Sequence, residues 1–500
     1  MNRISRRQFL RAAGASALAA RLWARAAHAL GPGEKPNLLF ITTDDMGLML
    51  GCYGDRQATT PHIDRLAGEG LRFNYGFVVS TCCCPSRSAM LTGLFPHANG
   101  HYGFIPEVKL HRWVRTFPAY LNPAGYYTGL IGKFHVAGAE DQFPFDHLVL
   151  TGKVNTRSPR AMGAAVARFL REAGDKPFFL MANITDPHRP YPGQGRGNPP
   201  WPNPHRPEDV PVPPYCLDTP TVRKDLALMY DAHSRADATI GAILAALDDA
   251  GKRDSTLVVL ISDHGPSLPG AKTTMFDAGI HIPFLARWPG VIAPGRVSDA
   301  LVSAVDILPT FLEAAGVEVD PKIQGRSFLR VLLDEDKRGA EQIFAEHTKA
   351  QGNRYFPTRV IRTHRFKYIR NLRPDIEFRN NALAGVVARE LMQLWETNPR
   401  ARFLLERVVR HPHEELYDLE NDPNEFHNLA DDPAYRDVLN DLRERLKRWM
   451  TETDDPWIAL WDYDGSKPDP FEPKKTKDGP FSPKWLDRAL RAARRRSGAG

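Results

Sequence analysis

The chain has few cysteines and no long hydrophobic segment. Only five of its 500 residues are cysteine, and three of these are consecutive, at residues 82–84. The other two, Cys52 and Cys216, cannot build a disulfide-rich scaffold, and whether they pair with each other is left open. No stretch reaches the ~18 apolar residues that a membrane span requires, so we expect no stable transmembrane helix.

A strong basic excess is also missing once the amino terminus is left out. The formal net charge is +7, but residues 1–29 contain six arginines and no acidic residue, so it is +1 without them. We therefore expect no nucleic-acid partner. Arg6 and Arg7 precede a run of small apolar residues and an Ala-His-Ala sequence ending at Ala29. This predicts a twin-arginine signal peptide over 1–29, with a basic amphipathic tail as the alternative.

The signal predicts the location of the protein and one of its partners. Export by the twin-arginine (Tat) machinery would place the mature protein in the periplasm or outside the cell, and this route carries folded proteins. We predict three further segments: a catalytic domain over 34–340, a small C-terminal α+β domain over 341–470 and a basic tail over 471–500. For the arginine-rich tail, a solvated end is our interpretation and contact with a polyanion is the alternative.

Three short apolar runs each end in polar residues. Runs of this kind are typical of strands buried on both faces of a sheet, and helical patterns between them indicate a mostly parallel sheet covered by helices. Because ligands bind beyond the carboxyl ends of such strands, we expect the polar residues to share one edge. The runs span 36–43, 177–184 and 256–262, followed by Asp44-Asp45, Asp186-Pro187-His188 and Asp263-His264; helices are expected near 63–70, after Cys83 and from about 225 to 250.

The pattern changes near residue 344. Residues 359–362 and 365–369 alternate like half-exposed strands around a turn, residues 415–419 predict another strand, and a helix is expected over 435–451. We predict a smaller antiparallel sheet with a helix. His347 and Arg359 would lie on its segments that wall the cleft and could bind sugar hydroxyls or a carboxylate, the alternative being surface charges on a half-exposed sheet.

The most specific motif lies between Thr81 and Gly93. Cys83 stands at an expected helix start, where free backbone N–H groups and the helix dipole favour an anion, and Pro85 is tolerated in the first turn. Arg87 follows one helical turn later, where it could neutralise and orient the group at Cys83. Three other interpretations of the cysteines are a metal knuckle, a disulfide and a buried inert thiol.

The string Cys83-x-Pro85-Ser86-Arg87-x-x-x-Leu91-Thr92-Gly93 resembles the signature of the type I sulfatases. The resemblance implies an α/β, alkaline-phosphatase-like sandwich with a large mostly parallel sheet covered by helices and a smaller C-terminal antiparallel sheet domain. It also implies that a maturation enzyme oxidises Cys83 to Cα-formylglycine, whose hydrated aldehyde supplies the nucleophile.

Further site residues match positions of that family. Carboxylates at strand ends suit a hard divalent cation, and the resemblance assigns Ca²⁺. Lys133 and His135 are expected on one side of a strand, at i and i+2. His188 is the candidate acid for the leaving group, and Lys272 would bind sulfate. The metal ligands are predicted to be Asp44, Asp45, Cys83, Asp263 and His264, and the catalytic residues Cys83, Arg87, Lys133, His135 and His188.

Four further segments resemble the heparan N-sulfatase branch of the family. They span 96–103, 186–189, 415–418 and 452–457. The resemblance implies a sulfated saccharide as substrate, with the N-sulfate of glucosamine in heparin or heparan sulfate as the group removed. The alternatives are an O-sulfatase acting on another glycan or an aryl sulfate, a phosphate or phosphonate ester hydrolase, and a glycan-binding protein without catalysis. The oligomeric state, with a homodimer among the options, is left open.

Overall fold

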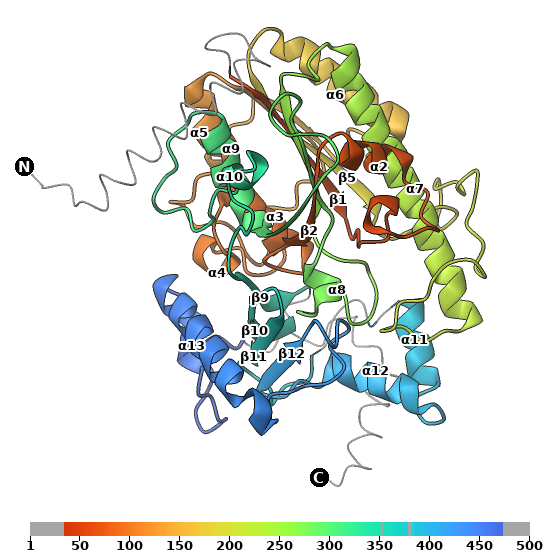
Figure 1. Cartoon of the computed structure of the whole chain (residues 1–500), viewed down its shortest axis with the longest axis vertical. Coiled ribbons are helices and arrows are strands. Elements are labelled where there is room, and N and C mark those ends of the chain that lie inside the picture. The colour runs from red at the N-terminus through yellow and green to blue at the C-terminus, as the bar shows by residue number, and fades with distance from the viewer. Residues whose placement is uncertain (1–34, 352–353, 379–382, 384, 474–500) are drawn as a thin grey trace, which may run out of the picture.

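An eight-stranded sheet forms the larger layer of the molecule (Figure 1). The computed structural model describes residues 35–351, 354–378, 383 and 385–473, so the predicted signal peptide and nearly all of the predicted tail lie outside the described residues. The strand order is β4-β3-β5-β1-β6-β7-β2-β8. The strands are β1 (Asn37–Asp44), β2 (Leu71–Phe77), β3 (Tyr127–Gly132), β4 (His147–Leu150), β5 (Phe178–Pro187), β6 (Thr256–Ser262), β7 (Phe284–Arg287) and β8 (Arg296–Ser303).

The three strands predicted from apolar runs lie together at the centre of this sheet. β1 pairs in parallel with β5 on one side and with β6 on the other. Only β7 runs against its neighbours, pairing antiparallel with both β6 and β2. The carboxyl ends of β1, β5 and β6 therefore meet at one edge, which confirms the predicted sheet.

Side chains of β1 alternate between two cores, one on each face of the sheet. Leu39 and Ile41 pack into a cluster with α2 (Pro61–Gly68), α6 (Pro159–Ala173) and α7 (Pro220–Asp249). Leu38 and Phe40 face the other cluster, which includes side chains of α3 (Cys83–Thr92), α5 (Phe117–Leu121), α9 (Ile307–Ala314) and α10 (Leu329–Leu332). Because β1 is buried on both faces, its central residues 38–41 are all apolar.

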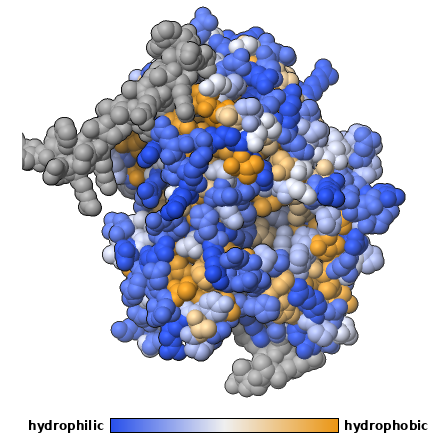
Figure 2. All heavy atoms as spheres, viewed as in Figure 1, coloured by the Kyte–Doolittle hydropathy of each residue, from blue (hydrophilic) through white to orange (hydrophobic). Residues whose placement is uncertain are grey.

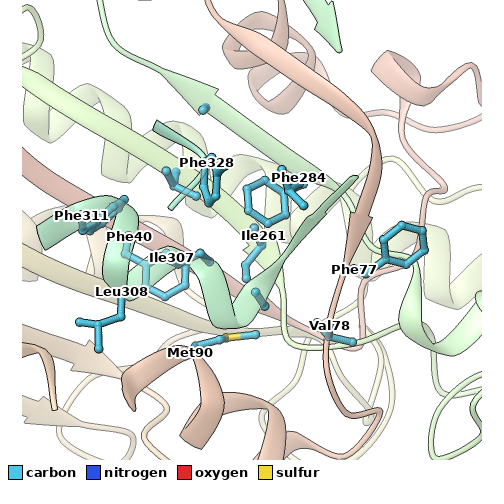
Figure 3. Packing of buried hydrophobic residues seen from close by; sticks show 14 of the residues in the cluster. Phe40, Phe77, Val78, Met90, Ile261, Phe284, Ile307, Leu308, Phe311 and Phe328 are labelled. Atoms are coloured by element: carbon cyan, nitrogen blue, oxygen red, sulfur yellow. The ribbon is translucent and has the colours of Figure 1, made fainter. Parts of the chain in front are cut away.

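The second core anchors the helix that carries the cysteine motif. Phe40 from β1 and Ile261 from β6 lie opposite Met90 of α3 and Phe311 of α9 (Figure 3). The rings of Phe40 and Phe311 meet edge to face with centroids 6.0 Å apart. This packing holds α3 against the sheet, so that its first residue is fixed at the sheet edge.

The long helix α7 begins earlier than the sequence pattern indicated. The apolar stripe predicted a start near Asp225, whereas the helix starts at Pro220. Thr219 caps it by accepting a hydrogen bond from the Val222 backbone N–H at 3.2 Å, and proline is favoured at the first helical position. A capping threonine followed by proline was therefore the better boundary signal.

A separate four-stranded antiparallel sheet forms the smaller layer, in the order β12-β11-β10-β9. Its strands are β9 (Ile343–Ala350), β10 (Arg354–Arg362), β11 (Phe366–Asn371) and β12 (Glu414–Asp418). α13 (Arg436–Glu452) packs on it through Leu442, Leu446 and Trp449. These elements confirm the predicted fold class; the domain boundaries stay a prediction.

Two helices in this smaller layer were not anticipated. α11 (Val386–Gln393) and α12 (Pro399–Val409) are inserted between β11 and β12 and lie on the β12 side of the sheet (Figure 1). The short helices α4 (Pro96–Asn99) and α8 (Asp277–Ile280) complete the set of α-helices.

Helices long and apolar enough to cross a bilayer are absent from the described part of the chain. On the face shown in Figure 2, hydrophilic residues predominate and hydrophobic ones form separate patches.

Candidate active site

Four polar residues lie where β1 and β6 end. Thr43 is in register with Ser262, so Asp44-Asp45 and Asp263-His264 follow side by side. The backbone N–H of Asp45 donates to Asp263 Oδ1 at 3.1 Å. Asp45 has φ 68°, a left-handed conformation that is unfavourable for a non-glycine residue. The structure thus holds Asp45 in a strained conformation, and its side chain lies at this edge of the sheet.

Cys83 is the first residue of α3, with Cys82 at the N-cap. Its Sγ lies 3.2 Å from His264 Nε2 and 3.7 Å from Asp44 Oδ1, and the residue is only 2% exposed. Burial on its own would raise the pKa of the thiol, but the charges of Lys133 and Lys272 outweigh it and hold that pKa well below its ordinary value. Cys83 therefore differs chemically from an inert buried thiol.

The donor atoms around Cys83 form a set that could hold a cation. One ligand atom each from Asp44, Asp45, Cys83 and His264 all lie within 4.8 Å of one another. Asp45 Oδ2 is buried and makes no hydrogen bond. His264 Nδ1 lies 2.9 Å from the Gly265 carbonyl, which can only accept, so Nδ1 carries a proton and Nε2 is the nitrogen that could bind a cation.

Crowded negative charge supports the same interpretation. Burial and the neighbouring Asp44 raise the pKa of Asp263 to about 6. Asp263 Oδ1 lies 3.7 Å from His264 Nε2, at the border of the set. A divalent cation would relieve this repulsion, and carboxylate oxygens are its preferred ligands. The predicted residues Asp44, Asp45, Asp263, His264 and Cys83 are thus brought together, and they fit such an ion.

Three cationic side chains surround the acidic residues. Lys133 forms an ion pair with Asp44, and Lys272 Nζ donates to Asp45 Oδ1 at 2.6 Å. Arg87 donates through Nε to Asp263 Oδ2 at 3.0 Å and also binds the backbone of β1. Arg87 therefore fixes Asp263, whereas its spacing from Cys83 predicted that it would orient the Cys83 group directly.

Lys133 and His135 do not lie on a strand, so the prediction that they share one side of a strand was wrong. β3 ends at Gly132, whose φ is 107° and whose missing Cβ would lie 1.9 Å from the Asn183 carbonyl oxygen. The chain turns there, so Lys133 reaches Asp44 from a loop. His135, with φ 56°, is half-buried, and its Nδ1 is buried without a hydrogen bond. Among the described residues, no hydrogen bond joins His135 to Cys83.

His188 follows directly after β5 at the same edge. The residue is half-buried, and its Nδ1 lies 2.5 Å from the Arg189 carbonyl oxygen. That carbonyl can only accept, so Nδ1 carries the proton in this contact and Nε2 is left for a ligand. The pKa of Asp44 is well below its ordinary range: burial opposes this, and the charges of Lys133 and His188 are the two main causes of the lowering. His188 thus lies within electrostatic reach of the acidic set.

His347 and Arg359 are buried and do not wall an open cleft. His347 is 2% exposed, and its Nδ1 lies 3.8 Å from Cys82 Sγ. Burial, together with Arg359 and His411, lowers the pKa of His347 to about 3, so it is neutral. Arg359 is 0% exposed and donates to Asp455 at 2.5 and 3.1 Å. Neither expectation holds for these two residues: they are too buried to contact a sugar, and they are not exposed surface charges.

Arg359 belongs to a buried ionic cluster that joins the two layers. Its Nε lies 3.8 Å from Glu346 Oε2, and Glu346 pairs with His97 of α4. The donors of His97, Glu346 and Asp455 are close enough to suggest a metal site, but the guanidinium already supplies the positive charge among them. The cluster is therefore an ion-pair network.

Replacing Arg359 with methionine should lower the free energy of unfolding by about 3–5 kcal/mol, since it leaves Glu346 and Asp455 buried without their partner. Chemical denaturation would measure this. Arg168→Met is the control, because Arg168 pairs with Glu172 at a site where the arginine side chain is 69% exposed, and such pairs contribute less than about 1 kcal/mol. Equal effects of the two substitutions would contradict the argument.

One residue at this edge, Arg157, was not anticipated from the sequence. Ser86, which belongs to the Cys83 motif, donates to the Asp263 carbonyl at 2.6 Å, whereas Arg157 binds the segment that carries His188. Arg157 lies in the loop between β4 and α6, where no periodicity or motif distinguishes it from other surface arginines.

Comparisons with known proteins agree with this geometry. The Sulfatase family profile matches residues 36–317, and that of N-sulphoglucosamine sulphohydrolase, C-terminal, matches residues 271–379. Human N-sulphoglucosamine sulphohydrolase is 32% identical over 487 residues, covering 85% of this chain and 92% of the human protein. An ulvan-active sulfatase of Formosa agariphila is 32% identical over 436 residues, covering 83% and 80%.

Solved structures share the fold. A protein in complex with its substrate D-glucosamine-2-N,6-O-disulfate superposes with a TM-score of 0.64 at 22% identity, covering 84% of this chain and 99% of that one. A 2-O GAG sulfatase gives a TM-score of 0.64 at 23% identity, covering 85% and 94%. The family match over more than half of the sequence and the identity with the human enzyme together show that this chain belongs to the sulfatase family.

Proposed function

We propose that this sulfatase removes the N-sulfate of glucosamine in heparin or heparan sulfate, using Ca²⁺ and a formylglycine formed from Cys83. One observation carries the proposal: Cys83 Sγ lies 3.2 Å from His264 Nε2 and 3.7 Å from Asp44 Oδ1, in a set of donors bordered by Lys133 and Lys272. The choice of substrate is supported by the human relative, N-sulphoglucosamine sulphohydrolase, at 32% identity.

Asp44, Asp45, Asp263 and His264 would hold the cation together with the modified residue 83. When bound, the cation supplies Lewis-acid polarisation and the formylglycine supplies an oxygen nucleophile. Lys133 and Lys272 place positive charge near residue 83, where they would stabilise the charge that develops on the sulfuryl oxygens. Arg87 keeps Asp263 oriented by its hydrogen bond at 3.0 Å.

His188 would donate a proton to the leaving nitrogen. An amine leaves poorly as an anion, so protonation matters more for a sulfamate than for an aryl sulfate. The hydrogen bond of Nδ1 to the Arg189 carbonyl directs Nε2 away from the backbone, as a proton donor requires. His135, close in sequence to Lys133, would contribute a second imidazole that binds a sulfate oxygen of the substrate.

We also propose that the protein is exported by the twin-arginine route to the periplasm or beyond, after a maturation enzyme has acted on Cys83. The support is the sequence around Arg6 and Arg7 and the ability of that route to carry folded proteins. The burial of Cys83 in the folded chain favours modification before or during folding.

The substrate assignment predicts a clear preference among monosulfated glucosamines. With equal concentrations of the N-, 3-O- and 6-O-sulfated sugars, we expect kcat/KM for the N-sulfate to exceed the others by at least about tenfold, a discrimination that a polar site can provide. Sulfate release measures it, and an aryl phosphate serves as the control for phosphate ester hydrolysis. Preference for an O-sulfate would refute the N-sulfatase proposal and leave the sulfatase family unaffected.

A further inference from the structure

We infer that Arg157 is a positioning residue that holds His188 in place for proton delivery. This inference rests on the proposed role of His188. The observation behind it is that one guanidinium group binds the backbone carbonyls of His188 and the two residues after it, as well as the side-chain carboxylate of Asp186. Arg157 comes from a different part of the sheet edge, the loop between β4 and α6, so it ties two loops together.

Arg157 donates to several acceptors in the segment that follows β5. Its Nη2 lies 2.8 Å from the carbonyl oxygen of His188 and 3.4 Å from that of Arg189, and its Nη1 lies 3.2 Å from that of Pro190. Nη1 also forms an ion pair with Asp186. The planar fork of arginine can serve such a group of acceptors at once, which the single ammonium of lysine cannot do.

The orientation of the imidazole depends on one of these carbonyls. His188 Nδ1 lies 2.5 Å from the Arg189 carbonyl oxygen, which also faces Arg157 Nη2. A shift of that carbonyl would rotate the ring and move Nε2. Because a misplacement of about 1 Å can cost 10²-fold in rate, the anchoring of this peptide has a direct effect on catalysis.

Asp186 provides the fixed point for the arrangement. It is 0% exposed, and Arg235 of α7 binds it through Nε at 2.6 Å and Nη2 at 2.8 Å. Arg235 also binds Asn198, whose side-chain amide donates to the carbonyls of Pro190 and Tyr191. Arg235 therefore secures the buried carboxylate, whereas Arg157, at 19% side-chain exposure, secures the carbonyls next to His188. Loss of Arg157 leaves the Asp186–Arg235 pair intact.

A purely structural role of Arg157 and a positioning role predict different rate losses for substrates with different leaving groups. A nitrophenolate leaves without a proton, so its release does not need the acid, while a sugar amine or alkoxide does. Damage to the whole site would slow both reactions equally. Misplacement of the acid would slow mainly the sugar substrate.

The experiment compares Arg157→Gln with wild type on two substrates: the monosulfated glucosamine that is turned over fastest, and 4-nitrophenyl sulfate. We expect kcat to fall by about 10- to 100-fold on the sugar and by less than about threefold on the aryl sulfate. Arg157→Lys, which keeps the charge beside Asp186 but not the planar fork, should show the same pattern with a wild-type melting temperature. Arg160→Gln, on the exposed side of α6, is the matched control and should change neither rate.

A parallel measurement on His188→Gln separates the two levels of the proposal. If His188→Gln shows the leaving-group pattern and the Arg157 variants show equal losses or none, the positioning role is overturned while His188 remains the acid. If His188→Gln itself slows both substrates equally, the assignment of the acid fails and the positioning role fails with it.

Discussion

Replacing Cys83 with alanine should reduce sulfatase turnover by roughly 10⁴-fold or more, because removal of a catalytic nucleophile leaves only binding and electrostatic contributions. The protein should still fold. Cys83 loses one sulfur atom at a helix start, and a small deletion of this kind costs on the order of 1 kcal/mol. Sulfate release from the best sugar substrate and thermal unfolding measure the two effects.

The neighbouring cysteines provide the control. Burial raises the pKa of Cys84 to about 12, and burial also raises that of Cys82 well above its ordinary value, whereas the pKa of Cys83 is lowered. Cys84 is buried and is not one of the donors grouped around Cys83, so Cys84→Ala should keep most of the activity. Peptide mass analysis of active protein should find the aldehyde or its hydrate at residue 83 alone. Modification at Cys84, or an active Cys83→Ala protein, would contradict the assignment.

The edge of the large sheet could be predicted because its signals are local. Each apolar run that became β1, β5 or β6 is followed at once by its acidic or histidine residue, and parallel strands bring such ends together. The motif at Cys83 added the fourth segment. Nothing in these steps required knowledge of contacts between distant residues.

The predictions that were wrong, for Arg359 and Lys133, failed for a different reason. Arg359 was expected at a cleft wall because its strand alternates, but Asp455, 96 residues later, covers that face and binds the guanidinium. Likewise, β3 ends at Gly132, before Lys133, where the backbone has a positive φ and lies too close to the Asn183 carbonyl for a side chain. Both outcomes depend on tertiary contacts that alternation and spacing do not encode.

Arg157 illustrates what no local pattern could supply. Its partners are three carbonyl oxygens and a carboxylate in residues 186–190, about 30 positions away in the sequence. Backbone carbonyls leave no trace in side-chain composition, so an arginine that binds them looks like any solvated arginine until the fold is known.

If the proposed cation is bound, its removal should abolish turnover and lower the melting temperature of the protein. A ligand that binds only the folded state stabilises it by about 2.7 kcal/mol at a free concentration of 100 times Kd, and chelation removes that contribution. Without the ion, Asp263 keeps a pKa raised to about 6 by burial and by Asp44, a sign of repulsion that the ion would relieve. Unfolding followed with and without a chelator, and restoration by added Ca²⁺, measure the effect.

Asp45→Asn provides the matched variant, because Asp45 Oδ2 is the buried acceptor that makes no hydrogen bond in the donor set. The amide has one oxygen and no charge, so the variant should bind the ion weakly, and the chelator should no longer shift its melting temperature. Elemental analysis of purified protein should find close to one Ca²⁺ per chain in wild type and much less in Asp45→Asn. This readout does not depend on whether Cys83 has been converted. If fully chelated wild type turned over normally, or if Asp45→Asn retained the ion, the metal site would have to be abandoned.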